Sequence, residues 1–290
     1  MIALDRLLDD IDRQFLAPRL VEKSLQLLLD QRSIRQGDLE KHAFQSSVWK
    51  KAKPQLLLES HNKCAYCESP TAVVAFGDVE HFRPKSVYWW WAYCLDNFLA
   101  SCAICNQKFK SDKFPLLGRR LRGPLVRRNS RDTTLSRLSV EIAPDPLDDT
   151  ALERFLDDHD SEMTLLVNPY IDEPADYFAW RADMNIREVE LIAFDNDDIS
   201  ADCVAAAEDV YGLNRQQLRT LRYMTFEKLL TVSLTLEDSG ISASTRQTNA
   251  ATLNRMLAPD HPYAGMVRFF NDLGPVEEWV RQGFFVVPDP

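Results

Sequence analysis

The chain has 290 residues, of which 45% are hydrophobic and 27% are charged, and this composition excludes a largely disordered protein. Its net charge of −10 excludes a protein that coats nucleic acid by bulk electrostatics, so a nucleic-acid function would need a local basic track or a partner that supplies one. No apolar run approaches the ~20 residues that span a bilayer, and charges interrupt the N-terminus where a signal peptide is apolar, so we expect a cytoplasmic protein without membrane contact.

Residues 1–60 predict a helical support that carries no chemistry of its own. A helix over residues 1–33 is indicated by apolar residues at helical spacing, namely Leu4, Leu7, Leu8, Ile11 and Phe15. A second helix is predicted from about Ser46 to Ser60, although Pro54 falls within it.

Residues 61–118 contain two Cys-x-x-Cys pairs and form the segment richest in candidate functional residues. The pairs are Cys64 with Cys67 and Cys102 with Cys105, and 34 residues separate them. Thiols stay reduced in the cytosol, so paired cysteines indicate metal ligands rather than disulfides. Four thiolates close a tetrahedral zinc site and leave no open position. We therefore expect one structural Zn²⁺.

A Glu80-His81 dyad lies between the cysteine pairs, in a predicted short strand that ends at Arg83-Pro84. A carboxylate is a hard ligand suited to Mg²⁺ or Mn²⁺, and a neutral imidazole can accept a proton from water at physiological pH. Phosphodiester hydrolysis requires both roles. Neighbouring strand residues point to opposite faces, so we expect the dyad at the strand end, where both side chains can approach one site.

Two asparagines complete this set of candidates. Asn106 follows the second cysteine pair directly, on an expected helix where Lys110 is four residues further along the same face. Asn106 can offer a carbonyl oxygen to a cation, and Lys110 can reach a phosphate. Asn97 can hydrogen-bond to the His81 ring and fix its orientation.

Residues 119–164 are predicted to be a charged insertion or linker. Arginines dominate residues 119–137, and acids dominate residues 141–162. Two interpretations stay open, because the two halves can pair with each other or the segment can be a solvated surface loop.

Residues 165–290 predict a C-terminal helical region. Leu213-Asn214-Arg-Gln-Gln217-Leu218 has the pattern of a helix start, with Asn214 as the cap. A last helix is expected to begin near Pro262.

The motif module resembles a known nuclease family. Its pattern of Cys-x-x-Cys, Glu-His-x-x-Pro-Lys, Asn-Phe and Cys-x-x-Cys-Asn-x-x-Lys is similar to HNH endonucleases with the ββα-metal fold. The variant Glu-His-Phe-Arg-Pro-Lys, with Lys113-Phe114-Pro115 after the second pair, resembles the HNH subunits of Septu-type antiphage systems (PtuB-like), which also occur in some retrons. Looser matches follow around Asn168, Asn214 and Arg268.

This resemblance implies a fold, a reaction and a partner. The expected fold is mainly α, with a small ββα-metal (HNH) module tied by the four-cysteine zinc site. The resemblance implies that His81 is the general base, that Asn106 is a ligand of the catalytic Mg²⁺ or Mn²⁺, and that Glu80 and Asn97 occupy the family's second ligand and middle-asparagine positions. It further implies a DNA substrate and an ABC-type ATPase partner (PtuA-like).

Substrate contacts are expected from four basic residues near the dyad, Arg83, Lys85, Lys108 and Lys110, with help from the arginines at 119–128. Two other functions remain open, namely a catalytically inert zinc module that binds DNA or a protein, and a purely structural zinc protein. The His81–Asn106 pair separates these alternatives from the nuclease, because an inert module needs neither residue.

Overall fold

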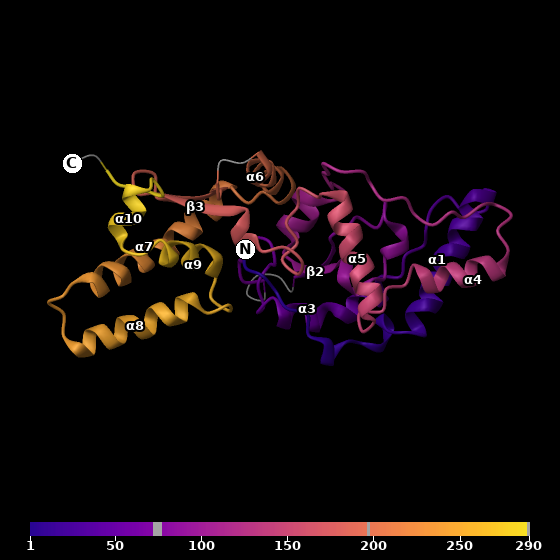
Figure 1. Cartoon of the computed structure of the whole chain (residues 1–290), viewed down its shortest axis with the longest axis horizontal. Coiled ribbons are helices and arrows are strands. Elements are labelled where there is room, and N and C mark those ends of the chain that lie inside the picture. The colour runs from indigo at the N-terminus through magenta and orange to yellow at the C-terminus, as the bar shows by residue number, and fades with distance from the viewer. Residues whose placement is uncertain (72–76, 196–197, 289–290) are drawn as a thin grey trace.

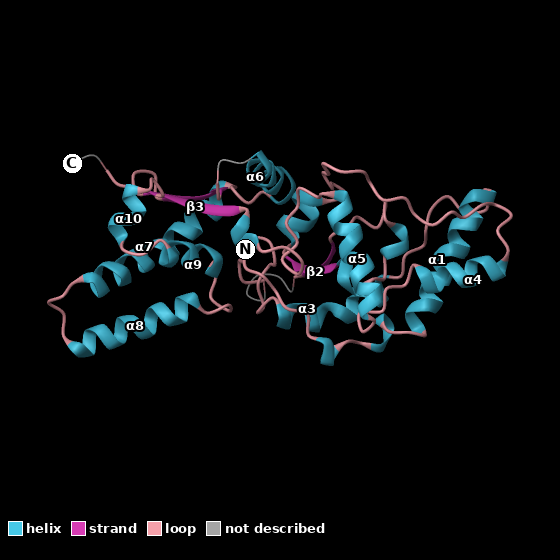
Figure 2. Ribbon diagram, viewed as in Figure 1, coloured by secondary structure: helices cyan, strands magenta, loops and turns pink. Residues whose placement is uncertain are grey.

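The computed structural model describes residues 1–71, 77–195 and 198–288. Helices α7 to α10 lie at one end of the long axis, and α1 and α4 lie at the other (Figure 1). Figure 2 shows that helices predominate and that the strands are few and short. This agrees with the expectation of a mainly helical protein.

The N-terminal part is helical, but its first helix begins later than predicted. Its helices are α1 (Arg19–Gln36), α2 (Ser46–Trp49) and α3 (Lys53–Glu59), with 3₁₀ segments at Leu8–Asp10, Arg13–Phe15 and Lys50–Ala52. The chain before α1 is otherwise irregular because the Asp12 side chain accepts a hydrogen bond from Gln14 N and closes a local turn. Pro18 immediately precedes α1 and has no N–H to continue a helix from residues 1–15.

The second predicted helix, over residues 46–60, is present in three consecutive pieces. Pro54 lies in the first turn of α3, where its missing N–H breaks no helical hydrogen bond. The proline is therefore compatible with the helical reading of this segment.

Two antiparallel strands and a wide helical turn form the centre of the molecule. Strand β1 (Asp78–His81) pairs with β2 (Phe98–Ser101), and His81 lies opposite Phe98. The chain then enters the π-helical segment η6 (Ile104–Lys110), in which Ser111 N donates to the carbonyl five residues earlier, that of Asn106. The loop between the strands carries 3₁₀ turns at Trp89–Trp91 and Leu95–Asn97.

Residues 119–164, expected as a charged insertion, contain two folded helices. These are α4 (Asp132–Glu141) and α5 (Asp149–Glu162), and α4 packs against α1. In the described part of the chain, none of the arginines at 119–128 forms an ion pair with the acidic run at 141–162. Among the described residues, the one ion pair between the two halves of this segment joins Arg137 to Glu141.

A buried ion pair fastens α5 to the centre. Arg83 Nε lies 2.7 Å from Glu162 Oε2, and neither side chain has any exposed surface. The other carboxylate oxygen accepts from the Tyr88 hydroxyl at 2.5 Å and from Leu121 N at 3.0 Å. The Arg83 guanidinium also lies over the ring of Trp91. One carboxylate thus joins the β1–β2 loop, the chain before α4 and the end of α5.

The C-terminal part includes a sheet that the sequence analysis did not anticipate. Strands β3 (Phe178–Asp183), β4 (Glu188–Ala193) and β5 (Phe285–Val286) form a sheet in the order β4-β3-β5. The helices around it are α6 (Asp198–Tyr211), α7 (Gln216–Glu237), α8 (Ala243–Leu257), α9 (Ala264–Asp272) and α10 (Val276–Arg281), and a 3₁₀ turn occurs at Pro174–Asp176. The last-helix prediction near Pro262 agrees with α9.

Asn214 has a different role from the predicted helix cap. Its Oδ1 accepts from Leu191 N at 2.8 Å and its Nδ2 donates to Leu191 O at 2.9 Å. Asn214 therefore binds the backbone of β4, and α7 begins two residues later with Arg215 in the capping position.

None of the helices in the described ranges is both long enough and apolar enough to cross a membrane.

We predict that Glu162→Gln strongly destabilises the protein. The substitution keeps the shape of the side chain but leaves the Arg83 charge buried without a counter-charge, which costs about 3–5 kcal/mol. Urea denaturation measures this loss. The control is Glu227→Gln, which breaks the exposed ion pair with Arg187 and should cost less than about 1 kcal/mol. Equal losses in the two variants would contradict a special role for Glu162.

Candidate metal centre and nuclease site

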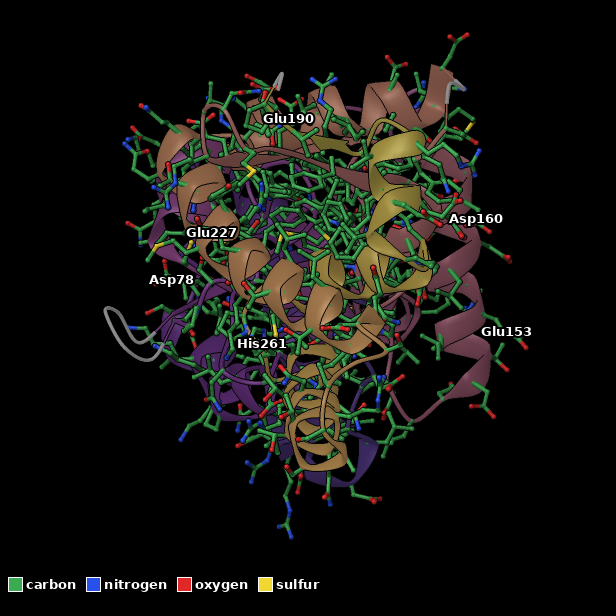
Figure 3. All side chains as sticks on the ribbon, turned by 90° about the vertical axis from the view of Figure 1, so that its left-hand side faces the viewer. Asp78, Glu153, Asp160, Glu190, Glu227 and His261 are labelled. Atoms are coloured by element: carbon green, nitrogen blue, oxygen red, sulfur yellow. The ribbon has the colours of Figure 1, made fainter. Side chains whose placement is uncertain are left out.

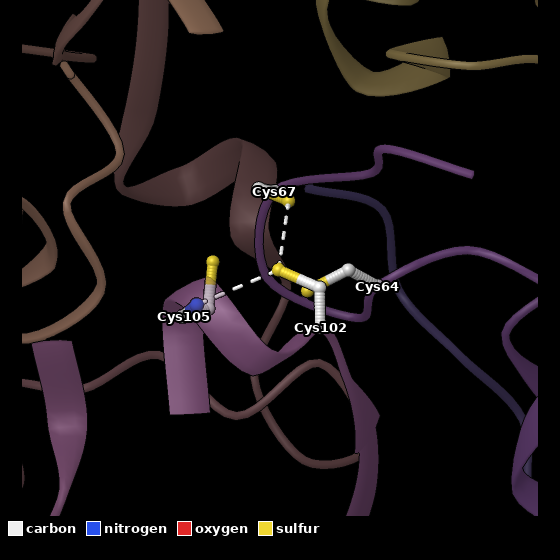
Figure 4. A group of neighbouring side chains, drawn as sticks. All are labelled: Cys64, Cys67, Cys102 and Cys105. Carbon is white, nitrogen blue, oxygen red and sulfur yellow. Dashed lines mark hydrogen bonds between the residues drawn. The ribbon is translucent and has the colours of Figure 1, made fainter. Parts of the chain in front are cut away.

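The four cysteines of the two Cys-x-x-Cys pairs meet in space. The sulfurs of Cys64, Cys67, Cys102 and Cys105 all lie within 4.8 Å of one another, and Cys67 Sγ and Cys102 Sγ are 4.0 Å apart (Figure 4). A tetrahedral zinc ion with ~2.3 Å bonds places its sulfurs about 3.8 Å apart. All four thiols are free. The cluster therefore fits a metal ion such as zinc, as the spacing predicts.

Local backbone contacts place the cysteines. The first pair lies in a turn where Glu68 N donates to Cys64 O, and Ala65 N donates to Ala100 O of β2. Cys102 follows β2 directly, and Cys105 lies in η6. A metal ion held by all four sulfurs would fasten this turn to the start of η6.

Positive charge surrounds the sulfurs. Arg215 Nη1 lies 3.7 Å from Cys105 Sγ. Arg222 is fully buried on α7, and burial lowers its pKa to about 10, so it stays charged at neutral pH. The hydrogen bond from Cys102 holds the pKa of Cys67 well below its usual range, whereas burial raises the pKa of Cys64 and the hydrogen bond with Cys102 raises the pKa of Cys105. Two arginines that sequence analysis had not identified thus favour the thiolate form that metal binding needs.

His81 is the last residue of β1 and its ring is held firmly. Its Nε2 lies 3.1 Å from the carbonyl oxygen of Ala92, and Trp49 and Phe98 pack edge-on against the imidazole. A carbonyl can only accept, so Nε2 carries the proton and Nδ1 is left to act as a base. Burial, assisted by the charge of Lys85, lowers the pKa of His81 to about 3. The imidazole is therefore neutral at pH 7.

Glu80 points to the other side of β1 and is held inside the protein. Its Oε1 lies 2.6 Å from Lys110 Nζ, with 4% of the glutamate side chain exposed and none of the lysine. Burial raises the pKa of Glu80 against the opposing effect of Lys110. The stacked rings of Tyr66 and Tyr211 lie nearby, and the Glu80 charge contributes to the raised pKa of both phenols. The two side chains of the dyad therefore contact different surroundings.

Asn106 faces a carboxylate that sequence reasoning missed. Its Nδ2 donates to Asp78 Oδ2 at 3.3 Å, and Gln107 Nε2 donates to the same oxygen at 2.8 Å. Asp78 is half-buried and lies at the surface in Figure 3. Because Asp78 and Glu80 are two residues apart on a strand, both face η6, and this spacing is the signal by which Asp78 could have been found.

Asn97 binds the loop between the strands rather than the histidine. Its Oδ1 accepts from Arg83 N at 2.8 Å, and its Nδ2 donates to Arg83 O at 3.0 Å. The hydrogen bond to the His81 ring that we expected from Asn97 is made by Ala92 instead. Asn97 therefore fixes the shape of the loop that carries Ala92.

The four basic candidates divide into two pairs. Arg83 and Lys110 are fully buried and form ion pairs with Glu162 and Glu80. Contrary to the expectation from the sequence, they are not exposed to a substrate in this structure, and they hold the fold together instead. Lys85 is half-buried with its Nζ 5.5 Å from the centre of the Trp49 ring, and Lys108 is exposed. Only this second pair can reach a phosphate.

Part of the chain is similar to a protein of known name. The Septu protein PtuB of Bacillus mycoides (strain KBAB4) is 36% identical over an alignment of 69 residues that covers 19% of this chain and 23% of that protein. The match thus spans less than a quarter of that relative's length. No protein-family model and no solved structure matches the chain.

We predict one tightly bound zinc per chain, which Cys67→Ser should remove together with folding stability, because the binding energy of a structural site is largely folding energy. Arg215→Ala keeps all four ligands but loses the contact with Cys105, and should weaken zinc retention about 10–100-fold. Elemental analysis and the rate of zinc transfer to a chelator measure these effects.

Two variants serve as controls for the metal prediction. Cys94→Ala removes a buried cysteine outside the cluster, and Arg255→Ala removes an exposed arginine of α8. Both should retain zinc as the wild type does. Zinc-free wild-type protein with free thiols would refute the site.

Proposed function

We propose that this protein is a metal-dependent, HNH-like nuclease that hydrolyses phosphodiester bonds of DNA, and that it acts in a Septu-type antiphage defence system. Two independent lines support the proposal. One is the partial similarity to the Septu protein PtuB, and the other is the chemistry available around β1, β2 and η6.

The observation that carries the proposal is the state of His81. Its ring is fixed by the carbonyl of Ala92, which leaves Nδ1 as the unprotonated nitrogen that can accept a proton. A water molecule that attacks a phosphorus atom needs such a base to take its proton. Lys85, whose charge acts on His81, would bind the phosphate that is attacked.

The catalytic cation would be held by Asp78 and Asn106. Both are half-buried, and their remaining oxygens, Asp78 Oδ1 and Asn106 Oδ1, make no hydrogen bond among the described residues. Carboxylate and amide oxygens suit Mg²⁺ or Mn²⁺. Asp78 faces η6 and lies three residues before His81, whose side chain faces the other side of β1, so such a cation would bind a phosphate from the η6 side of the strand. Glu80 could coordinate this cation only if its ion pair with Lys110 were broken.

A metal ion bound by the cysteine cluster would hold the first cysteine turn against the start of η6. Asn106 follows Cys105 directly, so this metal ion would also help to position Asn106. Loss of the structural metal should therefore displace Asn106 from Asp78.

In a Septu-type setting the protein would act with an ABC-type ATPase subunit (PtuA-like). The resemblance of the Glu-His-Phe-Arg-Pro-Lys motif and the partial match to PtuB support this assignment. We infer that the ATPase subunit controls when cleavage occurs and that His81 and its neighbours carry out the cleavage.

We predict that His81→Ala lowers plasmid nicking by about 10²–10⁴-fold, the contribution of a positioned base, in the presence of Mg²⁺ or Mn²⁺. His61→Asn serves as the control, because His61 is a half-buried histidine with a positive φ outside the site. Urea midpoints establish that both variants are folded. Nicking at the wild-type rate by a folded His81→Ala protein would refute the assignment.

A second prediction separates the two carboxylates of β1. Asp78→Asn should raise the Mn²⁺ concentration needed for half-maximal nicking and leave stability nearly unchanged. Glu80→Gln should leave Lys110 buried and unpaired, lowering stability by about 3–5 kcal/mol with little effect on the Mn²⁺ requirement. The reverse pattern would assign the cation to Glu80.

A further inference from the structure

An extended segment between η6 and α4 carries an unusual concentration of positive charge. Six arginines occur between residues 119 and 131 with no acid among them: Arg119, Arg120, Arg122, Arg127, Arg128 and Arg131. All six side chains are exposed. We call residues 117–128 the arginine strap. The chain as a whole has a net charge of −10, so this charge is a local exception.

The backbone of the arginine strap makes close contacts with the end of α5 and with Trp90. Leu117 N donates to Met163 O at 3.0 Å, Gly118 N donates to Glu162 O at 2.9 Å, and Leu121 N donates to the buried Glu162 carboxylate. A Cβ on Gly118 would lie 2.6 Å from a carbonyl oxygen, and one on Gly123 would lie 2.7 Å from the ring of Trp90. These contacts fix the position of the backbone that carries the arginines.

The charges of the strap are not neutralised within the molecule. Some exposed arginines elsewhere are paired, as Arg137 is with Glu141 and Arg187 is with Glu227, whereas others such as Arg19 and Arg255 form no ion pair with the described residues. In the described part of the chain, the six strap and flanking arginines take part in no ion pair. A cluster of unpaired like charges is costly unless a ligand of opposite charge uses it.

The strap also lines a depression whose positively charged side chains suit an anion. An open depression of about 380 Å³ is lined by Arg119, Arg120, Leu121, Arg122 and Ser161. Guanidinium groups bind phosphate oxygens through pairs of hydrogen bonds, and the Ser161 hydroxyl adds a further polar group. The lining fits a phosphate group.

We propose that the arginine strap is a binding surface for the phosphate backbone of a nucleic acid, with the hollow at Arg119–Arg122 as its principal phosphate site. This inference rests on the proposed function and names where its substrate binds. From Arg119 to Arg128 an extended chain reaches at most about 30 Å, and phosphates along one strand rise by about 3.4 Å each. A linear run of charge thus matches a linear polyanion of several nucleotides.

The buried Glu162 links this surface to His81. Its Oε1 accepts from Leu121 N in the strap and from the hydroxyl of Tyr88 in the β1–β2 loop. The same loop provides Ala92, whose carbonyl holds the His81 ring. A backbone bound on the strap is therefore held at a fixed position relative to the base.

The test compares two triple variants of the full-length protein. Arg119→Gln, Arg120→Gln and Arg122→Gln remove the charges around the hollow. The control, Arg19→Gln, Lys228→Gln and Arg255→Gln, removes three exposed charges from α1, α7 and α8. Fluorescence anisotropy measures binding of labelled duplex DNA, single-stranded DNA and RNA across a KCl series, without added Mg²⁺ or Mn²⁺ so that no cleavage occurs.

We expect the strap variant to bind at least tenfold more weakly at 100 mM KCl. We also expect its slope of log K against log salt to fall by about 2–3, since each phosphate contact contributes about 0.7–0.9. The control should bind as the wild type does. The relative affinities for the three labelled probes identify the preferred nucleic acid.

Three results would overturn the proposal. These are equal weakening in both variants, unchanged binding by the strap variant, and competition by polyglutamate as strong as that by DNA, which would assign the surface to an acidic protein. The outcome is separable from that of the proposed function. Strap-dependent binding without any nicking by the wild type would refute the nuclease alone, whereas nicking with strap-independent binding would refute the strap alone.

Discussion

A carboxylate with no exposed surface has to find all its partners inside the protein, and Glu162 finds them in two separate segments. It pairs with Arg83, accepts from Tyr88 and accepts from Leu121 N. Removing such a charge from water is expensive, and only good geometry compensates for it. The β1–β2 loop, the chain before α4 and the end of α5 are therefore positioned together by one side chain.

The sequence predicted those parts of the site that depend on local spacing. Two Cys-x-x-Cys pairs sufficed to predict the metal cluster, because each tight turn directs both of its sulfurs to one point. The position of His81 at the end of a short strand also followed from the local pattern. The partners of the charged residues did not, since Lys110 reaches Glu80, and Glu162 reaches Arg83, across long stretches of chain. A charged residue is normally expected at the surface, and only the tertiary fold shows that these are inside.

Some elements of the fold could also be predicted from the sequence, and others could not. The helices over residues 46–60 and after Pro262 follow from apolar periodicity. The first helix was placed too early because its apolar spacing was given more weight than Pro18. The strands β3 and β4 were missed, although Phe178, Trp180 and Ala182 alternate with other residues and are buried, a pattern typical of a strand. Asn214 fits a capping pattern, but the chance to bind both backbone groups of Leu191 outweighs it.

The turn that carries Cys64 and Cys67 depends on residues far along the chain. Lys63 Nζ donates to His261 O at 2.9 Å, and Glu68 accepts from Gly265 N at 3.2 Å. These contacts join positions nearly two hundred residues apart, and proteins are synthesised from the N-terminus. On the ribosome, the cysteine turn would emerge long before the segment that supports it. The metal centre would therefore reach its final form only when the last helices have left the exit tunnel, so a partly made chain would lack a finished site.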